Sequence, residues 1–186
     1  MSNTSIKISC DDGCASDIRL ARLCNKHEIE CVFYWPVEWH SLALFKGYEP
    51  LRYVQAEDIA MKFEIGAHTI THRHLTDLRH SEALYEIAES KLMLENMFAP
   101  RTITKFAPPR GYTNKELTEY TLQIYGSQRL TKQPNLVHVH PNSGANDNKP
   151  WQECITDKTT ELFCHSHELD KFNLWDELEA YLETTK

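Results

Sequence analysis

Residues 64–75 read EIGAHTITHRHL and place three of the chain's ten histidines within seven positions, directly after a short apolar run. Gly66 permits a tight turn just before them. His68 and His72 lie four positions apart, and on a helical turn that spacing puts both imidazoles on one face. Neutral imidazole nitrogens suit zinc and neighbouring metals. The stretch therefore predicts a strand that leads into a metal-binding segment, although an amphipathic turn with surface histidines would show the same spacing.

Composition limits the classes of partner. The 186 residues fit one domain, residues 1–186, and are enough for a hydrophobic core without disulfides. The 27 acidic and 20 basic residues give a net charge of -7 without a Lys/Arg block, which argues against nucleic acid or an anionic membrane as partner. The polar start MSNTSIKIS and the absence of a long apolar run predict neither secretion nor membrane insertion, so we expect a cytoplasmic protein with reduced cysteines.

Strand and helix patterns alternate along the chain. Apolar and β-branched runs predict strands at residues 5–10, 30–37, 64–66, 102–107, 136–139 and 161–164. Helical spacing predicts helices at residues 17–27, 56–63, 81–97, 115–125 and 174–182, with a shorter one within 38–50. This βαβα order predicts an α/β fold, whose active site usually follows the carboxyl ends of the strands.

Chemically useful side chains follow several of these strands. Asp11 and Asp12 come after the first, His68 and His72 after another, and His165 after the last. One aspartate and two histidines supply the three protein ligands that a catalytic zinc usually takes. The other aspartate of the pair would then serve as a base, and His165 as an acid for a leaving group.

The sequence resembles the polysaccharide deacetylases with a NodB homology domain, carbohydrate esterase family four. The first motif of that family ends in Asp-Asp-Gly, as residues 9–13 (SCDDG) do. The second, a histidine pair after Ile-Gly, is matched by residues 65–72 (IGAHTITH), and the third, an aromatic turn with two prolines, by residues 106–112 (FAPPRGY). Residues 162–165 (LFCH) match the late strand that ends in histidine. The matches occur in the family order and cover nearly the whole chain.

The resemblance implies a distorted (β/α) barrel with fewer than eight repeats and a divalent metal held by Asp12, His68 and His72. The metal most expected is zinc, with cobalt, manganese or nickel as alternatives. Asp11 would be the general base, and His165 the acid that protonates the departing amine. The turn that contains Pro109 and Arg110 would contact the substrate, and its backbone N–H would help to stabilise the oxyanion.

Two positions depart from the family pattern. Ala107 stands where the family usually has an arginine that orients the base aspartate, so Arg110 or Arg73 would have to replace it. The fourth motif, an aspartate and a tryptophan that support the catalytic histidine, has only loose counterparts in Trp151 and Asp157. The sequence therefore leaves the partners of Asp11 and His165 open.

Three assignments keep an alternative. His167 could replace His165 as the acid if the last strand continued, because residues two apart point to the same side. His138 and His140 form another pair on one face and could bind a second metal. Three aromatic side chains could form a platform for a sugar ring, although core positions are the more common role: Tyr34, Trp35 and Trp39.

The main functional hypothesis is hydrolysis of the N-acetyl group of an N-acetylated sugar or glycan precursor by attack of metal-bound water, with an aspartate base and a histidine acid. Ala107 and the short chain motivate the alternative of an amidohydrolase that acts on a small non-sugar amide. A non-catalytic metal-binding or carbohydrate-binding relative is the remaining alternative. The sequence does not specify an oligomeric state.

Overall fold

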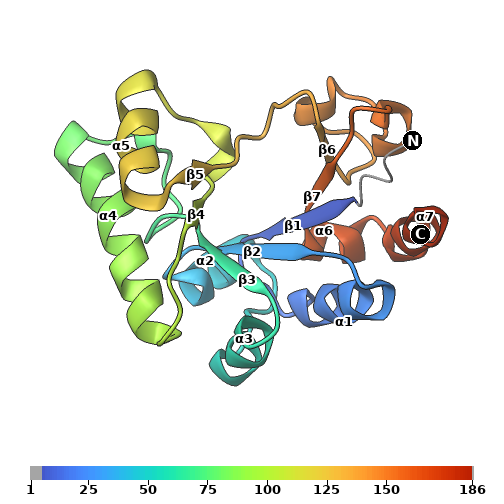
Figure 1. Cartoon of the computed structure of the whole chain (residues 1–186), viewed down its shortest axis with the longest axis horizontal. Helices are drawn as coiled ribbons and strands as arrows, with labels where there is room; N and C mark the ends of the chain where they lie inside the picture. The colour runs from blue at the N-terminus through green and yellow to red at the C-terminus, as the bar shows by residue number, and fades with distance from the viewer. Residues whose placement is uncertain (1–5, 186) are drawn as a thin grey trace.

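In the computed structural model, which describes residues 6–185, seven parallel strands form one sheet that curls into an open half-barrel (Figure 1). The sheet order is β5-β4-β3-β2-β1-β7-β6, so the first strand of the chain, β1, lies between β2 and β7. The strands are β1 (Lys7–Asp11), β2 (Cys31–Trp35), β3 (Glu64–Ala67), β4 (Lys105–Phe106), β5 (Ser127–Gln128), β6 (Leu136–His138) and β7 (Glu161–His165). This arrangement is the distorted (β/α) barrel that the sequence predicts.

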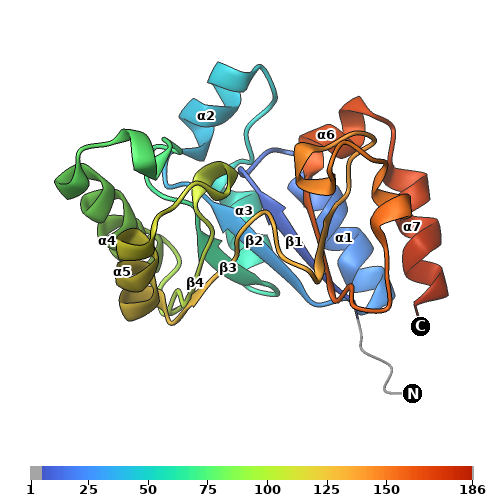
Figure 2. The same ribbon diagram turned by 90° about the horizontal axis from the view of Figure 1, so that it is seen from above.

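Helices cover the outer face of the curled sheet, while α2 lies beyond the carboxyl ends of β1 and β2 (Figure 2). They are α1 (Asp17–His27), α2 (Trp39–Lys46), α3 (Tyr53–Ala60), α4 (His80–Met97), α5 (Lys115–Tyr125), α6 (Ser166–Lys171) and α7 (Trp175–Thr184). Four short 3-10 helices complete the connections: η1 (Leu75–Asp77), η2 (Pro109–Gly111), η3 (Gly144–Asn146) and η4 (Trp151–Cys154). None of the helices within residues 6–185 is long and apolar enough to cross a membrane.

The predicted alternation of strands and helices is confirmed, with local differences. Helices at residues 17–27 and 115–125 have the predicted bounds, whereas the strand predicted at 102–107 is reduced to the two residues of β4. The sequence did not predict β5 or α6. The prediction that His68 and His72 share a helical turn is wrong, because residues 68–74 form a loop. Residue 5 of the first predicted strand lies outside the described residues.

The core packs the inner strands against the outer helices. Trp35 and Trp39 have no exposed surface, and their rings lie 5.7 Å apart, while Tyr34 is 4% exposed. These aromatic residues stabilise the interior, so the suggestion that they form a platform for a sugar ring is wrong. All six cysteines are free, as the sequence predicts.

Candidate active site

The residues with candidate roles gather at the carboxyl ends of the parallel strands. Asp11 ends β1 and is paired in register with His165, the last residue of β7. His68 directly follows β3, and the turn with Pro109 and Arg110 follows β4. Because parallel strands end at one edge of the sheet, segments that are distant in sequence meet there.

A strained turn positions Asp12 after β1. Its backbone adopts φ 85°, a left-handed conformation that costs a non-glycine residue free energy and that is found most often at functional sites. Gly13 follows with φ 73°, and a Cβ there would lie 2.8 Å from the Cβ of Trp39. The Asp-Asp-Gly sequence thus turns the chain sharply and leaves the Asp12 side chain fully buried.

Glu86 of α4 shapes the loop that carries the two histidines. Its Oε2 accepts hydrogen bonds from the backbone N–H groups of Ile70 (2.7 Å) and Thr71 (3.0 Å). Its side chain is 3% exposed. Within the loop, the Thr69 hydroxyl accepts a hydrogen bond from the backbone N–H of His72, at 3.0 Å. A buried carboxylate therefore holds an irregular backbone whose N–H groups no strand partner satisfies.

Asp12, His68 and His72 are brought together and fit a divalent metal. The Oδ1 atom of Asp12 lies 3.0 Å from His72 Nε2 and 3.7 Å from His68 Nε2, yet it is buried and accepts no hydrogen bond. His68 Nδ1 lies 2.6 Å from the Ala107 carbonyl, so this nitrogen donates and Nε2 keeps its lone pair. Burial lowers the pKa of His68 to about 4, which keeps the ring neutral, as a metal ligand must be. The orphaned oxygen and the two imidazoles match the one-carboxylate, two-imidazole donor set that zinc sites use.

Lys46 approaches the same carboxylate from α2. Its Nζ lies 2.6 Å from Asp12 Oδ2. Burial raises the pKa of Asp12, but the positive charge on His165, the imidazole of His72 and Lys46 together hold it well below its usual value. Asp12 is therefore an anion at neutral pH, as metal coordination requires.

Arg129 holds the neighbouring carboxylate, Asp11. One guanidinium nitrogen lies 2.5 Å from each of the two Asp11 oxygens, and both side chains are 4% exposed. The guanidinium carbon lies 5.0 Å from the ring centroids of both Tyr34 and Phe163, within cation–π range. Burial raises the pKa of Asp11, but the charge of Arg129, with smaller contributions from His68 and His165, lowers it below its usual value. Asp11 is thus ionised and oriented, as a general base must be.

The partner of Asp11 comes from an unexpected strand. Neither Arg110 nor Arg73 contacts Asp11: Arg73 pairs with Glu86 at 3.3 Å, and Arg110 lines a cavity beside the site. In the parallel pair β4 and β5, Phe106 lies opposite Gln128, so Ala107 and Arg129 directly follow the two strands side by side. The Arg129 N–H donates to the Phe106 carbonyl at 2.9 Å. The arginine missing at Ala107 is therefore replaced from the adjacent strand. Its position in the sequence carries no recognisable signal.

His165 Nε2 lies 3.9 Å from Asp12 Oδ2, and its Nδ1 lies 2.9 Å from Glu168 Oε2. Burial lowers the pKa of His165, but the charge of Asp12 and the hydrogen bond to Glu168 raise it to about 9. The last strand does not continue past His165, because α6 begins at Ser166, and the His167 ring stacks on Tyr48 at 4.2 Å. The carboxylate beside His165 is Glu168, three residues later, a partner that the sequence analysis missed.

Trp151 and Asp157, which the sequence suggests as supports for His165, lie in other surroundings. Trp151 is buried against Tyr181, with ring centroids 5.4 Å apart, and Asp157 is exposed on a loop. A periodic pattern could not reveal Glu168, since α6 is only six residues long.

A cavity of about 230 Å³ opens beside these groups. Asp11, His72 and His165 line it, and Arg110 and Lys46 contribute positive charge. Pro109 is buried behind the turn, and Arg110 adopts φ 56°. A larger pocket of about 820 Å³ shares Lys46 and Glu168 with the cavity. The site therefore has a small polar chamber and an adjoining open pocket.

Comparison with known proteins assigns the family. A family model described as polysaccharide deacetylase matches residues 2–126, more than half of the chain. No curated protein that was compared matches the sequence.

Similar solved structures share the fold. One is BA3943 from Bacillus anthracis, a CE4 family pseudoenzyme, with a TM-score of 0.71 and 15% identity over 98% of this chain and 62% of that protein. The chain thus spans less than two thirds of that protein. Another is the Bc1960 peptidoglycan N-acetylglucosamine deacetylase, with a TM-score of 0.69 and 16% identity over 98% of this chain and 83% of that one. A third is a family 4 carbohydrate esterase from Streptomyces lividans, with a TM-score of 0.67 and 16% identity over 96% of this chain and 88% of that one. At these identities the likeness concerns the fold, and the family follows from the model match: the chain belongs to the polysaccharide deacetylase family.

Proposed function

We propose that this protein is a metal-dependent hydrolase that removes the N-acetyl group from an N-acetylated sugar or glycan precursor. The observation that carries the proposal is the buried Oδ1 of Asp12, which accepts no hydrogen bond and faces the Nε2 atoms of His68 and His72. Beside it, Asp11 is held as an anion by Arg129. A metal-binding set next to an oriented base suits amide hydrolysis better than metal storage.

Asp12, His68 and His72 would hold the metal, most plainly zinc, since two imidazoles and one carboxylate suit it. A divalent ion there would polarise the amide oxygen and lower the pKa of a water molecule. Asp11 takes the proton of the attacking water as its oxygen adds to the acetyl carbon. Arg129 keeps both Asp11 oxygens oriented during this transfer. Arg110, in the turn that follows Pro109, lines the cavity, and the backbone N–H groups of this turn would help to bind the developing oxyanion.

His165 completes the reaction on the opposite side of the amide. When the carbon–nitrogen bond breaks, the nitrogen needs a proton, because an amine anion is a very poor leaving group. The Nε2 atom of His165 donates that proton, and the products are acetate and the free amine. The raised pKa of His165 supports this role, since it keeps the ring protonated at neutral pH.

The dimensions of the site bear on the substrate. A cavity of about 230 Å³ is smaller than a typical ligand pocket, so it suits the acetamido end of a molecule rather than several sugar units. The adjoining pocket of about 820 Å³ could accept the remainder. A small non-sugar amide would also fit the cavity and is the alternative substrate class.

The test uses the full chain, stripped of metal and reloaded separately with zinc, cobalt, manganese or nickel. Acetate release is measured from N-acetylglucosamine, from its oligomers and from a panel of small N-acetyl amides. We expect metal-dependent release, and we expect Asp12→Ala to abolish both tight metal binding and turnover. His80→Ala is the matched histidine control, because its exposed ring pairs with Glu116 away from the site.

Three outcomes separate the alternatives. Cleavage of small amides but of no acetylated sugar would reject the sugar as substrate. Tight metal binding without cleavage of any amide or ester would indicate a silent relative, the class to which BA3943 is assigned. Full activity after metal removal would reject the proposed dependence of the activity on a metal.

A further inference from the structure

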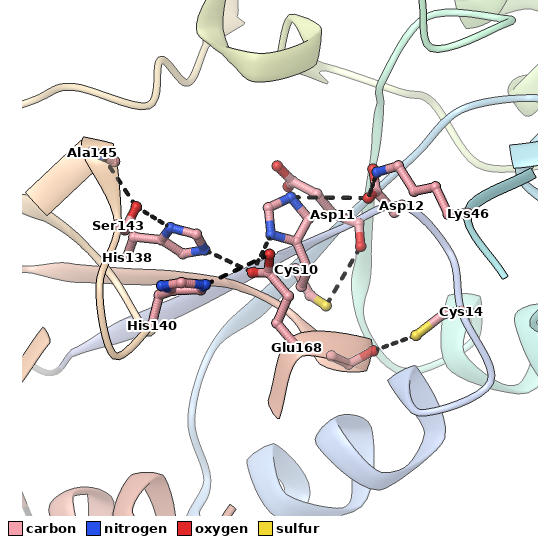
Figure 3. Close-up of polar contacts among 12 residues, drawn as sticks. Cys10, Asp11, Asp12, Cys14, Lys46, His138, His140, Ser143, Ala145 and Glu168 are labelled. Atoms are coloured by element: carbon pink, nitrogen blue, oxygen red, sulfur yellow. Dashed lines mark hydrogen bonds and ion pairs between the residues drawn. The ribbon is translucent and has the colours of Figure 1, made fainter. Parts of the chain in front are cut away.

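A second group of side chains meets at Glu168, beyond the three proposed metal ligands. The Oε2 atom of Glu168 lies 2.9 Å from His165 Nδ1 and 3.2 Å from His138 Nε2. The other oxygen, Oε1, lies 4.0 Å from His140 Nε2. Figure 3 shows the side chains of His138 and His140 pointing from one side toward Glu168, with Ser143 behind His138. Residues of β6, β7 and α6 thus converge on one carboxylate.

The hydrogen bonds around His138 allow one assignment of protons. Burial raises the pKa of Glu168, but the hydrogen bonds of His138 and His165 hold it well below its usual value, so Glu168 is an acceptor. Burial lowers the pKa of His138 to about 4, and its single ring proton must therefore be on Nε2, facing Glu168. Its Nδ1 then accepts from the Ser143 hydroxyl at 2.6 Å, and the Ser143 oxygen accepts from the Ala145 N–H at 3.1 Å.

His140 follows the same logic. Its Nδ1 accepts a hydrogen bond from the backbone N–H of Asn142 at 3.0 Å, so a ring proton lies on Nε2, toward Glu168. A metal ligand needs a lone pair on the nitrogen that faces the ion. In this arrangement His138 and His140 both present N–H groups instead. The cluster is therefore better described as a hydrogen-bond network than as a second metal site.

Packing fixes the position of His138. Its ring stacks on Phe163 with centroids 4.1 Å apart and planes 10° from parallel. The Asn146 side chain accepts from the His138 backbone N–H at 3.0 Å and donates to its carbonyl at 2.6 Å. His138 is 7% exposed. A rigid donor thus restrains the Glu168 oxygen that also contacts His165.

We infer that Glu168 is the positioning residue of His165, and that His138 and Ser143 hold Glu168 in place for that task. The inference rests on the proposed function, because it assigns a partner to the proposed acid. Glu168 fixes the proton of His165 on Nδ1, which directs Nε2 toward Asp12 and the substrate cavity. The role is one of orientation, since Glu168 contacts Nδ1 of His165 and not Nε2, the nitrogen that would reach the substrate.

Leaving-group chemistry provides the test. Amide cleavage breaks the carbon–nitrogen bond and needs a proton from His165 on the amine. Cleavage of 4-nitrophenyl acetate by the same attack releases a stable phenolate that needs no proton. Glu168→Gln should lower kcat for the acetylated amide roughly 100-fold and change kcat for the ester by less than about threefold, with KM nearly unchanged. Glu168→Asp should restore part of the amide activity.

The control is Glu153→Gln, an exposed glutamate on η4, which should leave both rates unchanged. An equal fall in the amide and ester rates of Glu168→Gln would overturn the inference, because it would indicate a structural role alone. If the unmodified chain cleaves neither compound, the proposed function fails, and a second measurement still tests the network.

That measurement is nitrogen-15 NMR of the histidine rings in the metal-free protein. We expect protonated Nδ1 on His165 and protonated Nε2 on His138, with the His165 Nδ1 proton exchanging faster in Glu168→Gln. A His138 ring that carries its proton on Nδ1 would overturn the assignment. So would a second equivalent of bound zinc that is lost in His138→Ala, since zinc would need the nitrogen that the network protonates.

Discussion

Asp11 and Asp12 are adjacent in sequence, yet their carboxylates meet different cations. Arg129 contacts both oxygens of Asp11, whereas Lys46 and the imidazole of His72 face Asp12. The first pairing engages both oxygens of Asp11, and the second leaves one oxygen of Asp12 without a hydrogen bond. Two identical side chains are thus suited to different tasks, proton transfer and metal coordination, by their surroundings alone.

Arg129 should matter for both stability and pH dependence. Arg129→Ala would leave a buried carboxylate unpaired, at a cost of about 3–5 kcal/mol in the free energy of unfolding. Burial would then dominate and raise the pKa of Asp11, so the acidic limb of the pH–rate profile should move to higher pH. Denaturant unfolding and the pH dependence of kcat/KM measure the two effects.

The register of β4 and β5 offers a sharper version of this experiment. Because Ala107 and Arg129 are lateral neighbours, the double variant Ala107→Arg with Arg129→Ala should regain part of the lost stability and restore the acidic limb toward lower pH. Arg22→Ala, an exposed arginine of α1, is the control. Unchanged stability and an unchanged acidic limb in Arg129→Ala would show that Asp11 does not depend on this partner.

At the residue scale, sequence reasoning recovered the groups that belong to short motifs. Asp11, Asp12, His68 and His72 lie within a few positions of a glycine and directly after strands, so their grouping could be predicted. Arg129 could not, because its contact depends on which residues of β4 and β5 lie opposite each other. Such lateral pairing is set by tertiary packing rather than by a local pattern.

At the scale of elements, length decided what could be predicted. The eleven-residue helices α1 and α5 have enough turns to show a helical pattern, and their bounds were correct. The strand β5 has two residues and the helix α6 has six, too few for either period to be recognised. Arg129 directly follows β5, and Glu168 lies in α6. The partners of the proposed base and the proposed acid were therefore the part of the site that the sequence missed.

The loop between β3 and η1 depends on a helix far from it in sequence. Glu86→Ala would leave the N–H groups of Ile70 and Thr71 without their acceptor, which costs about 1–3 kcal/mol for each group that stays buried. The His72 side chain would lose its fixed position, and we expect metal affinity to fall roughly 10- to 100-fold. Isothermal titration with zinc measures the affinity.

Glu89→Ala, on the same helix and only partly buried, serves as the control for a general loss of α4 stability. Adding a stabilising osmolyte should restore folding of Glu86→Ala without restoring its metal affinity. If Glu86→Ala and Glu89→Ala bind zinc equally well, the loop geometry does not require Glu86.

At the scale of the whole molecule, one buried carboxyl joins the central strands beneath the site. Asp17, the first residue of α1, has no exposed surface and accepts hydrogen bonds from Ser166 at 2.5 Å and Trp35 at 2.9 Å. The Cys10 thiol of β1 lies 3.3 Å away. The α/β fold followed from the βαβα pattern, but this junction of β1, β2 and α6 depends on the folded arrangement.

The ionisation of Asp17 should make stability depend on pH. Burial raises its pKa from 3.8 to about 7, although hydrogen bonds from Ser166, Trp35 and Cys10 oppose the rise. Between those values the folded state keeps a proton that the unfolded state has lost. The free energy of unfolding therefore falls as the pH rises from about 4 to about 7, by roughly 4 kcal/mol at most from this group.

Asp17→Asn removes that titration, so the stability of the unmodified chain relative to this variant should decrease between pH 5 and pH 7 in urea unfolding experiments and level off at higher pH. Exposed Asp58→Asn should show a constant difference over the same range. A constant difference for Asp17→Asn would mean that the carboxyl is ionised throughout. Because Ser166 follows His165, an ionised Asp17 would also place a fixed negative charge beneath the proposed acid, and the unfolding experiment thus bears on the site as well as on the fold.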